Sequence, residues 1–499
     1  MARSFESTRN NHINATPSEA IVMGLSQDGG LFVLRDLSDI KLETEELKDD
    51  NFNQIAKKII GTFFDDFTEE QLNESVYGAY DEKFDTEEIV PVVKVGDTFI
   101  MELFHGKTIA FKDIALSILP YLMKNAEKNC DSKEEIVILT ATSGDTGKAA
   151  LEGFKDIQGI RIIVFYPENG VSQVQKLQMV TQEGRNTHVV AIDGNFDDAQ
   201  SAVKGILNDE KIRLELKSRN IKFSSANSIN IGRLIPQITY YYSTYEKLVK
   251  NKAINRGDQV NFVVPTGNFG NILAGYFAKR MGLPVNKLIC AANENNILRD
   301  FINTGIYDIN RPFIKTMSPS MDILISSNLE RLLYYLSGCD NNYIAGLMKD
   351  LSTNKKYEVN DTIKKKLQEE FWSSYCNEEE TLETIKKIYQ HYGYVMDTHT
   401  AVAYKTYEDY IHAMQDQTKT VILSTASPFK FPGSVYKAIF GASDQSELTL
   451  MLSLSERTGL MIPKVVDGLG KKEVLHTRSC APEKMTNEIM LILSEGQDD

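Results

Sequence analysis

The chain has 499 residues, with 55 Lys and Arg against 69 Asp and Glu, which gives a formal net charge of −14. This length favours two or three domains over a single core. A content of 42% hydrophobic and 25% charged residues is that of a globular protein and argues against disorder, collagen and coiled-coil arrays. The acidic balance argues against general nucleic-acid binding, which needs a concentrated basic face. It still allows an anionic small molecule whose positive partners are local.

The cysteines, the N-terminus and the histidines bear on compartment and metal content. The 5 cysteines are scattered and form no C-x-x-C pair, which suits a reducing compartment and favours neither a zinc site nor a disulfide framework. The polar N-terminus lacks the apolar segment of a secretion signal, and no stretch approaches about 18 uncharged apolar residues. We therefore expect a soluble cytoplasmic protein without membrane contact. The histidines show no metal-ligand spacing, so we expect no metal site.

The predicted elements change character near residue 90. Residues 1–90 are expected to be mainly helical, apart from a turn at Asp28-Gly29-Gly30 that leads into a short strand. IVPVVKVGDTFIMEL is then typical of paired strands and IAFKDIALSILPYLMKNA of a helix, and a helical stretch is expected from about 340 to 390. Further β-branched runs, most followed by a turn and a helical pattern, predict an α/β protein with mainly parallel sheets. These runs are EEIVILT, IRIIVFYP, THVVAID, QVNFVVP, KLICAAN and TKTVILS.

Lys112 is the first candidate for chemistry. It follows His105-Gly106-Lys107-Thr108 and lies among apolar residues at the start of a predicted helix. Burial would disfavour the charged amine and lower its pKa. A lysine in such surroundings can form a Schiff base with an aldehyde cofactor. The alternative is a snorkelling helix lysine paired with Asp113.

Two strand–turn–helix loops are candidate anion sites. The loop at 139–147, LTATSGDTG, offers free N–H groups at a helix N-terminus, where the dipole favours an anion. Asp145 would repel that anion unless it points toward a protonated group. In the loop at 264–271, VPTGNFGN, several backbone amides can close around a phosphate. For both loops the alternative is an ordinary capped turn.

Two further segments have weaker signals. Residues 225–230, SANSIN, with Arg233 on the following helix, offer amides, hydroxyls and one guanidinium, or else form a polar loop with a surface arginine. Residues 424–431, STASPFKF, are by themselves the end of a strand and a proline turn. No GxSxG segment supports a serine nucleophile.

Taken together and in order, these segments resemble the threonine synthase family, pyridoxal-5′-phosphate enzymes with the tryptophan-synthase-β-like fold (fold type II), in its longer form. The resemblance covers most of the chain. It rests on STRN, SEAIVMGLSQDGGLFV, ELFHGKTIAFKD, LTATSGDTGKAA, SANSINIGRL, VPTGNFGN, MSPSMDILISSNLERLL, DTHTAVAY and STASPFKF. It implies an α/β fold with two open, twisted, mainly parallel sheet domains and a helical N-terminal region. The expected divisions are 1–90 for the N-terminal region, 91–130 and 231–499 for the large cofactor-binding domain, and 131–230 for the smaller domain.

The resemblance implies a role for each matching residue. Lys112 corresponds to the lysine that forms the Schiff base with pyridoxal phosphate. The other cofactor contacts would be Gly267, Asn268, Phe269, Gly270 and Asn271 around the phosphate with Thr266 at their edge, Thr425 at the pyridine nitrogen, and Asp145 near the 3′-oxygen. The residues expected to face the substrate's carboxylate and phosphate are Thr142, Ser143, Thr146, Asn227, Ser228 and Arg233.

The reaction implied by the resemblance converts O-phospho-L-homoserine and water to L-threonine and phosphate. We expect the protein to be a monomer or a homodimer. One position departs from the family segment HGPT, because Lys107 stands in place of the proline. We expect Lys107 either to attract the phosphorylated substrate or to point to solvent. Two alternative functions stay open: a phospho-lyase that releases 2-oxobutyrate, and a non-catalytic binding protein that keeps the fold.

Overall fold

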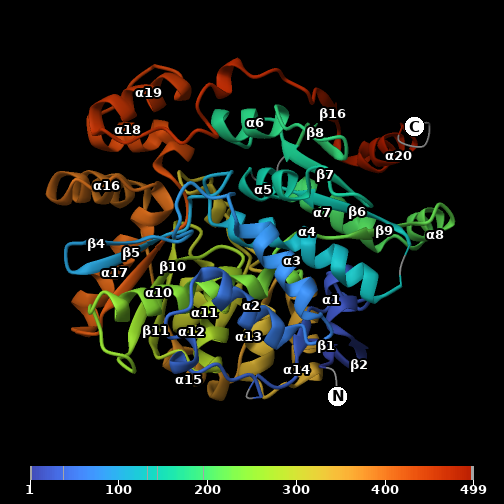
Figure 1. The fold of residues 1–499 in the computed structure, drawn as a ribbon, viewed down its shortest axis with the longest axis horizontal. Helices are drawn as coiled ribbons and strands as arrows, with labels where there is room; N and C mark the ends of the chain where they lie inside the picture. Colours follow the sequence, from blue (N-terminus) through green and yellow to red (C-terminus); the bar gives the residue numbers. More distant parts are fainter. Residues whose placement is uncertain (1–2, 38, 132, 143, 195, 496–499) are drawn as a thin grey trace.

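The computed structural model describes residues 3–495 apart from positions 38, 132, 143 and 195, and its framework is two separate sheets (Figure 1). Within the described chain the larger sheet has the order β14-β11-β10-β15-β5-β4, in which β4 alone runs antiparallel to its neighbour. Its strands are β4 (Val92–Val95), β5 (Thr98–Glu102), β10 (Val260–Pro265), β11 (Val285–Ala292), β14 (Phe371–Tyr375) and β15 (Thr420–Ser424). The paired strands predicted after residue 90 are β4 and β5.

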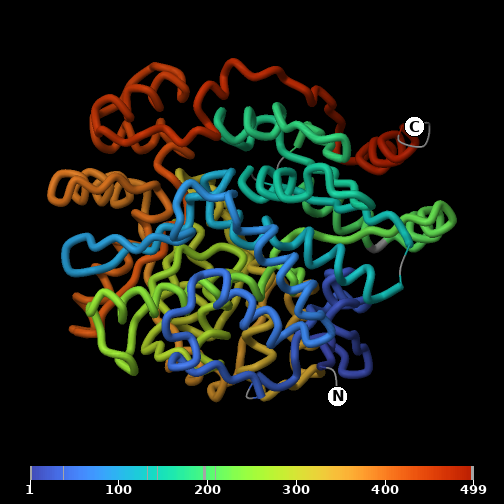
Figure 2. Tube along the Cα trace, in the orientation of Figure 1, coloured from blue at the N-terminus to red at the C-terminus, as the bar shows by residue number. Residues whose placement is uncertain are grey.

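The smaller sheet is parallel throughout the residues described, in the order β16-β8-β7-β6-β9. Its strands are β6 (Glu135–Ala141), β7 (Ile160–Pro167), β8 (Thr187–Ile192), β9 (Ile221–Ser224) and β16 (Arg478–Cys480). β16 comes from the C-terminal segment, which Figure 2 shows running along the same part of the molecule as β7 and β8. The domain boundaries predicted above stay predictions, and this last strand joins the sheet of the segment 131–230.

The strands are apolar because helices cover the sheets. α17 (Thr398–Met414) packs on β10, β11, β14 and β15, while α5 (Asp145–Phe154) and α7 (Phe196–Asn208) pack on strands of the smaller sheet. Covered parallel sheets give nearly continuous β-branched runs, which is the pattern that predicted these strands. The mainly parallel α/β fold expected from the sequence is therefore confirmed.

The N-terminal region supports the helix that begins at Lys112. Its helices α1 and α3 pack on α4 (Lys112–Asn129). The regular elements are β1 (Phe5–Ser7), β2 (Asn10–Ala15), α1 (Pro17–Met23), β3 (Phe32–Leu34), α2 (Phe52–Phe63) and α3 (Glu69–Tyr80). Each of the three helices starts with a capping box, a reciprocal pair of hydrogen bonds that satisfies free N–H groups. The region is mainly helical as predicted, with an additional antiparallel sheet in the order β2-β1-β3.

The remaining elements surround the two sheets. They are α6 (Gln173–Val180), α8 (Glu210–Ser218), α9 (Ile231–Leu234), α10 (Ile238–Lys250), α11 (Gly270–Met281), α12 (Ile297–Thr304), β12 (Ile306–Asp308), α13 (Leu329–Leu336), α14 (Asn341–Asn354), β13 (Lys356–Glu358), α15 (Asp361–Glu370), α16 (Glu378–Tyr392), α18 (Pro432–Phe440), α19 (Glu447–Thr458) and α20 (Met485–Glu495). None of the helices described has the length and apolar character needed to cross a bilayer.

Candidate active site

A pocket lies where strands of both sheets end. β6 ends at Ala141, β10 at Pro265 and β15 at Ser424, and in parallel sheets ligands bind beyond these carboxyl ends. The predicted residues that line the pocket are Lys112, Thr142, Thr146, Asn227, Ser228, Arg233, Thr266, Gly267, Asn268, Phe269, Gly270, Asn271 and Thr425. Ser143 lies outside the described residues. Asp145 does not line the pocket itself, but its Oδ2 lies 3.5 Å from the Nζ of Lys112, which does. Segments separated by more than 300 residues thus converge on one site.

Lys112 is the first residue of α4 and is 9% exposed. Its Nζ lies 3.5 Å from Asp145 Oδ2 and 3.4 Å from Ser320 Oγ. Burial lowers the pKa of Lys112 to about 8, helped by the charges of Arg233 and Lys430 and opposed by that of Asp145. The neutral amine, the form that acts as a nucleophile, is therefore far more populated near pH 7 than in an exposed lysine, at about a tenth of the molecules.

The carboxylate of Asp145 connects three elements. Oδ2 accepts a hydrogen bond from Ser320 Oγ at 2.7 Å, and Oδ1 accepts one from Gln175 Nε2 at 2.8 Å and lies 3.3 Å from Lys430 Nζ. Burial by itself would raise the pKa of Asp145, but the two lysine charges and these hydrogen bonds outweigh burial and hold it well below its usual range. Asp145 thus points toward the lysines Lys112 and Lys430. With its carboxylate turned to these groups, it does not prevent an anion from binding at the loop.

The loop between β10 and α11 forms a cup of backbone groups. A Cβ on Gly267 would lie 2.5 Å from the Ser320 carbonyl oxygen, so only glycine fits there. Phe269 has a φ of +62° and leads into α11, which begins at Gly270. Asn271 Oδ1 accepts hydrogen bonds from the hydroxyls of Tyr240 and Tyr241, which leaves its buried Nδ2 without a partner in the described chain. Free amides at a helix N-terminus suit a phosphate.

Arg233 is a buried guanidinium, 4% exposed, at the end of α9. Nη1 donates a hydrogen bond to the Ala226 carbonyl at 2.9 Å, whereas Nε has no partner among the described residues. Burial lowers the pKa of Arg233 to about 10, and its positive form still dominates at neutral pH. No carboxylate of the described chain forms an ion pair with it. An uncompensated buried charge facing a pocket needs an anionic ligand.

The loop after β6 and the end of β15 complete the walls. Thr142 Oγ1 accepts hydrogen bonds from the N–H groups of Gly144 and Gly147, so its hydroxyl caps α5 and keeps its own proton for donation. The Thr425 carbonyl accepts a hydrogen bond from the Phe111 N–H at 2.8 Å, which ties the end of β15 to the residue before Lys112.

Known proteins share this architecture. A family model for pyridoxal-phosphate-dependent enzymes matches residues 93–426, and models for the N-terminal and C-terminal parts of threonine synthase match residues 4–80 and 400–462. Threonine synthase of Saccharomyces cerevisiae is 36% identical over 457 residues, which cover 86% of this chain and 87% of the yeast protein. The chain belongs to the threonine synthase family.

Solved structures agree with this assignment. The crystal structure of yeast threonine synthase has a TM-score of 0.86 at 33% identity and covers 99% of both chains. That of pyridoxal-phosphate-bound threonine synthase from Brucella melitensis has a TM-score of 0.85 at 33% identity and covers 98% of both chains. Threonine synthase-like 1 from Homo sapiens is 40% identical over 437 residues, 85% of this chain but only 58% of the human protein. The chain thus spans less than two thirds of that relative.

The cofactor of this family, pyridoxal phosphate, is therefore the cofactor of this chain, and fold type II is confirmed. The residues present fit it on two observations. The close approach at Gly267 and the buried, unpartnered Asn271 Nδ2 create a cup for its phosphate. Lys112, with a lowered pKa, lines the same pocket and offers an amine for its aldehyde.

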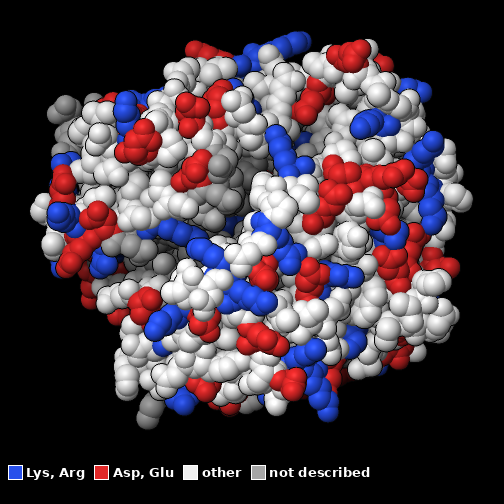
Figure 3. All heavy atoms as spheres, turned by 180° about the vertical axis from the view of Figure 1, so that it is seen from behind, with Lys and Arg blue, Asp and Glu red and all other residues white. Residues whose placement is uncertain are grey.

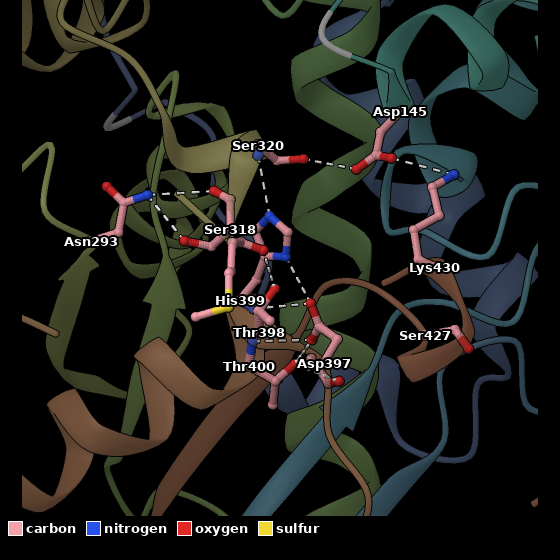
Figure 4. A network of polar contacts seen from close by, with 12 residues as sticks. Asp145, Asn293, Ser318, Ser320, Asp397, Thr398, His399, Thr400, Ser427 and Lys430 are labelled. Carbon is pink, nitrogen blue, oxygen red and sulfur yellow. Dashed lines mark hydrogen bonds and ion pairs between the residues drawn. The ribbon is translucent and has the colours of Figure 1, made fainter. Parts of the chain in front are cut away.

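Four residues of this threonine synthase-family site are additional to those predicted: Ser320, Asp397, His399 and Lys430 (Figure 4). The Ser320 N–H donates to His399 Nε2 at 3.2 Å, so His399 carries its proton on Nδ1 and donates it to Asp397 Oδ2 at 2.7 Å. The pair thereby fixes the turn that brings Ser320 Oγ against Asp145 and Lys112. The segments MSPSMDI, DTHTAVAY and STASPFKF carry the resemblance, yet no spacing within them indicates these partners.

Lys107 and His105 lie on the outer side of the same segment. Lys107 Nζ is 3.5 Å from Glu152 Oε1, its side chain is 46% exposed, and it does not line the pocket. Of the two expectations for Lys107, the structure fits the one that points it to solvent. His105 Nδ1 lies 2.6 Å from Asp85 Oδ1 and Nε2 lies 2.9 Å from Glu102 Oε2, so its ring connects these two carboxylates and holds the loop.

Proposed function

We propose that the chain is a threonine synthase, which converts O-phospho-L-homoserine and water to L-threonine and phosphate. The observation that carries this proposal is the buried guanidinium of Arg233, which lines the pocket of Lys112 without a carboxylate partner in the described chain. Such a pocket favours an amino acid with an additional anionic group over serine or threonine. The yeast relative at 36% identity, named threonine synthase, adds support.

In this proposal Lys112 is the residue that moves protons. Bound pyridoxal phosphate supplies an electron sink for the substrate's Cα. The neutral Nζ of Lys112 takes protons from Cα and Cβ, and Ser320 Oγ and Asp145 hold that nitrogen in place. Phosphate leaves from Cγ, and water adds its hydroxyl at Cβ. The two protons taken by Lys112 return to Cα and Cγ, and the remaining proton of the water goes to the phosphate. These changes balance as one substrate and one water giving threonine and phosphate.

The remaining predicted residues would hold the two ends of the substrate. Its carboxylate and phosphate are assigned to residues predicted from the sequence: Thr142, Ser143, Thr146, Asn227, Ser228 and Arg233. Thr425 is assigned to the pyridine nitrogen, where a neutral hydroxyl moderates the electron sink. Asp145 is assigned to the 3′-oxygen of the cofactor. Its contacts with Lys112 and Lys430 also favour a role in setting the charge of Lys112.

A phospho-lyase that releases 2-oxobutyrate is the second candidate. It is favoured by the 40% identity to threonine synthase-like 1, a name that leaves the reaction open. Both reactions need the same elimination of phosphate. The synthase then adds water at Cβ, whereas the lyase releases its product without that addition, and hydrolysis at Cα gives 2-oxobutyrate and ammonia. The monomer or homodimer state and the cytoplasmic location stay predictions.

Product analysis tests the proposal. The purified chain, loaded with pyridoxal phosphate, is given O-phosphohomoserine, and phosphate, threonine and 2-oxobutyrate are measured together. We expect threonine and phosphate in equal amounts, and loss of both with Lys112→Ala. Keto acid in place of threonine would establish the lyase, and release of neither product would leave a binding protein.

A further inference from the structure

Lys430 is a fully buried lysine, 0% exposed, at the end of the short turn Pro428–Lys430 after β15. Its Nζ donates hydrogen bonds to the Thr108 carbonyl at 2.9 Å and to Gln178 Oε1 at 2.8 Å, and lies 3.3 Å from Asp145 Oδ1. A buried ammonium is costly unless it is paired and fully hydrogen-bonded. Lys430 satisfies both conditions and sits beside the lysine of the active site.

Lys430 and Lys112 share the carboxylate of Asp145 from its two sides. Oδ1 faces Lys430, and Oδ2 accepts a hydrogen bond from Ser320 (Figure 4). Oδ2 also lies 3.5 Å from Lys112 Nζ. One negative charge in a buried site cannot neutralise two ammonium groups. Lys430 has two further acceptors and the shorter contact to Asp145. Among the described residues, Lys112 has only Ser320 Oγ at 3.4 Å as a hydrogen-bond partner besides the carboxylate. The carboxylate of Asp145 is therefore held more closely by Lys430 than by Lys112.

We propose that Lys430 is a positioning residue for the cofactor lysine: it anchors Asp145 and competes with Lys112 for the carboxylate, so that more of Lys112 is present as the neutral amine that reacts with the aldehyde of pyridoxal phosphate. The inference rests on the part of the proposed function that assigns the cofactor to Lys112. The pKa of Lys112, lowered to about 8 first by burial and then by Arg233 and Lys430, agrees with it.

Other charged groups near the pair do not replace Lys430. Asp113 faces it from α4, but its carboxylate already accepts hydrogen bonds from the Thr108 N–H and Oγ1 at 2.8 and 2.6 Å. Lys148 faces it from α5 and pairs with Glu152 at 3.2 Å. Asp145 is thus the carboxylate that links Lys430 to Lys112 in the described chain.

The rate at which the full-length chain, stripped of cofactor, captures added pyridoxal phosphate tests the inference, because only the neutral amine of Lys112 reacts. This rate is measured against pH for the original chain and for Lys430→Met. The midpoint is expected near 8 in the original chain. It should rise by about one pH unit in Lys430→Met, so that capture at neutral pH slows about tenfold. Lys430→Arg, which keeps the charge, should restore most of the rate.

Two further variants separate this effect from a loss of structure. Lys279→Met removes a lysine that pairs with Glu370 at the far end of α11, and its midpoint should not move. Asp145→Asn leaves Lys112 facing Arg233 and Lys430 without the carboxylate, so its midpoint should fall. If Lys430→Met does not fold, the inference is tested by whether the pH midpoint of cofactor capture falls in Asp145→Asn. A midpoint that is unchanged or lower in folded Lys430→Met, or unchanged in Asp145→Asn, would overturn the inference.

Capture of the cofactor involves no substrate, so it is independent of the reaction catalysed. A chain that shows the predicted shifts but forms no threonine supports the role of Lys430 and contradicts the proposed function. A chain that forms threonine but shows no shift overturns the role of Lys430 alone.

Discussion

Arg233 is a single residue whose buried positive charge favours the binding of an anion in the pocket. Its guanidinium is buried and lacks a carboxylate in the described chain, so binding a substrate anion relieves an unfavourable state. We expect Arg233→Met to lower kcat/KM for O-phosphohomoserine by about 30-fold, the loss of roughly 2 kcal/mol for a charged hydrogen bond. Inorganic phosphate should raise the melting temperature of the original chain more than that of the variant.

Arg331 provides the matched control for this prediction. It is equally buried, but it donates hydrogen bonds to the carbonyls of Phe32 and Ile229 and to Asn328 Oδ1. Arg331→Met should therefore lower the melting temperature and leave the protection by phosphate intact. Equal destabilisation by both variants, with phosphate protection retained in Arg233→Met, would assign Arg233 a purely structural role.

His105 predicts a pH dependence of stability. Burial by itself would lower the pKa of His105, but Glu102 and Asp85 on either side of the ring outweigh burial and raise it above 6.5. A raised pKa in the folded chain means that the charged ring stabilises the fold fully below pH 6.5 and loses this effect as the pH rises through the folded value. The melting temperatures of His105→Gln and the original chain should differ most in acid and converge in alkali. A difference independent of pH would exclude the charge as its cause.

At the scale of elements, the contact between the β10–α11 loop and the turn at Ser320 shapes the cofactor cup. Gly267→Ala would place a Cβ 2.5 Å from the Ser320 carbonyl oxygen and force the two segments apart. We expect the dissociation constant for pyridoxal phosphate, measured by equilibrium titration, to rise about tenfold or more, a cost of at least about 1.4 kcal/mol. Gly346→Ala on α14, with open space around it, should leave binding unchanged and stabilise the helix by up to about 1 kcal/mol. Unchanged affinity in Gly267→Ala would contradict the close approach.

Elements with a strong local pattern could be predicted from the sequence, and elements that depend on distant partners could not. Six strands are buried β-branched runs, and their composition alone predicts a strand: β6, β7, β8, β10, β11 and β15. β14, FWSSY, lies in the stretch expected to be helical and becomes a strand because it pairs with β11. β2, NNHINA, has little apolar pattern and is defined by its pairing with β1.

The same distinction holds for the candidate site. Lys112, the loop at 266–271 and Arg233 lie in segments whose residue types indicate their chemistry locally. Lys430 and His399 acquire their significance from partners in other segments, Thr108 and Asp145 for Lys430 and Ser320 for His399. Contacts across some 80 to 320 residues follow from the meeting of the two sheets, which no spacing within one segment expresses.

For the molecule as a whole, the net charge of −14 coexists with a pocket for anions. Figure 3 shows acidic and basic side chains interspersed over one face, so the surface is not uniformly repulsive. The anion-binding capacity instead lies inside, in the N-termini of α5 and α11 and in the buried Arg233. The acidity therefore disfavours binding of large polyanions such as nucleic acids, while the phosphorylated amino acid of the proposed function would be recognised by these local groups.

In the proposed site, Lys112 is the lysine that binds the cofactor and Lys430 is its charged neighbour. The most direct test is to reduce the chain with borohydride in the presence of pyridoxal phosphate, digest it, and locate the attached pyridoxyl group by mass spectrometry. We expect the group on the peptide that contains Lys112, with Lys430 unmodified. A pyridoxyl group on Lys430, or none on Lys112, would contradict it.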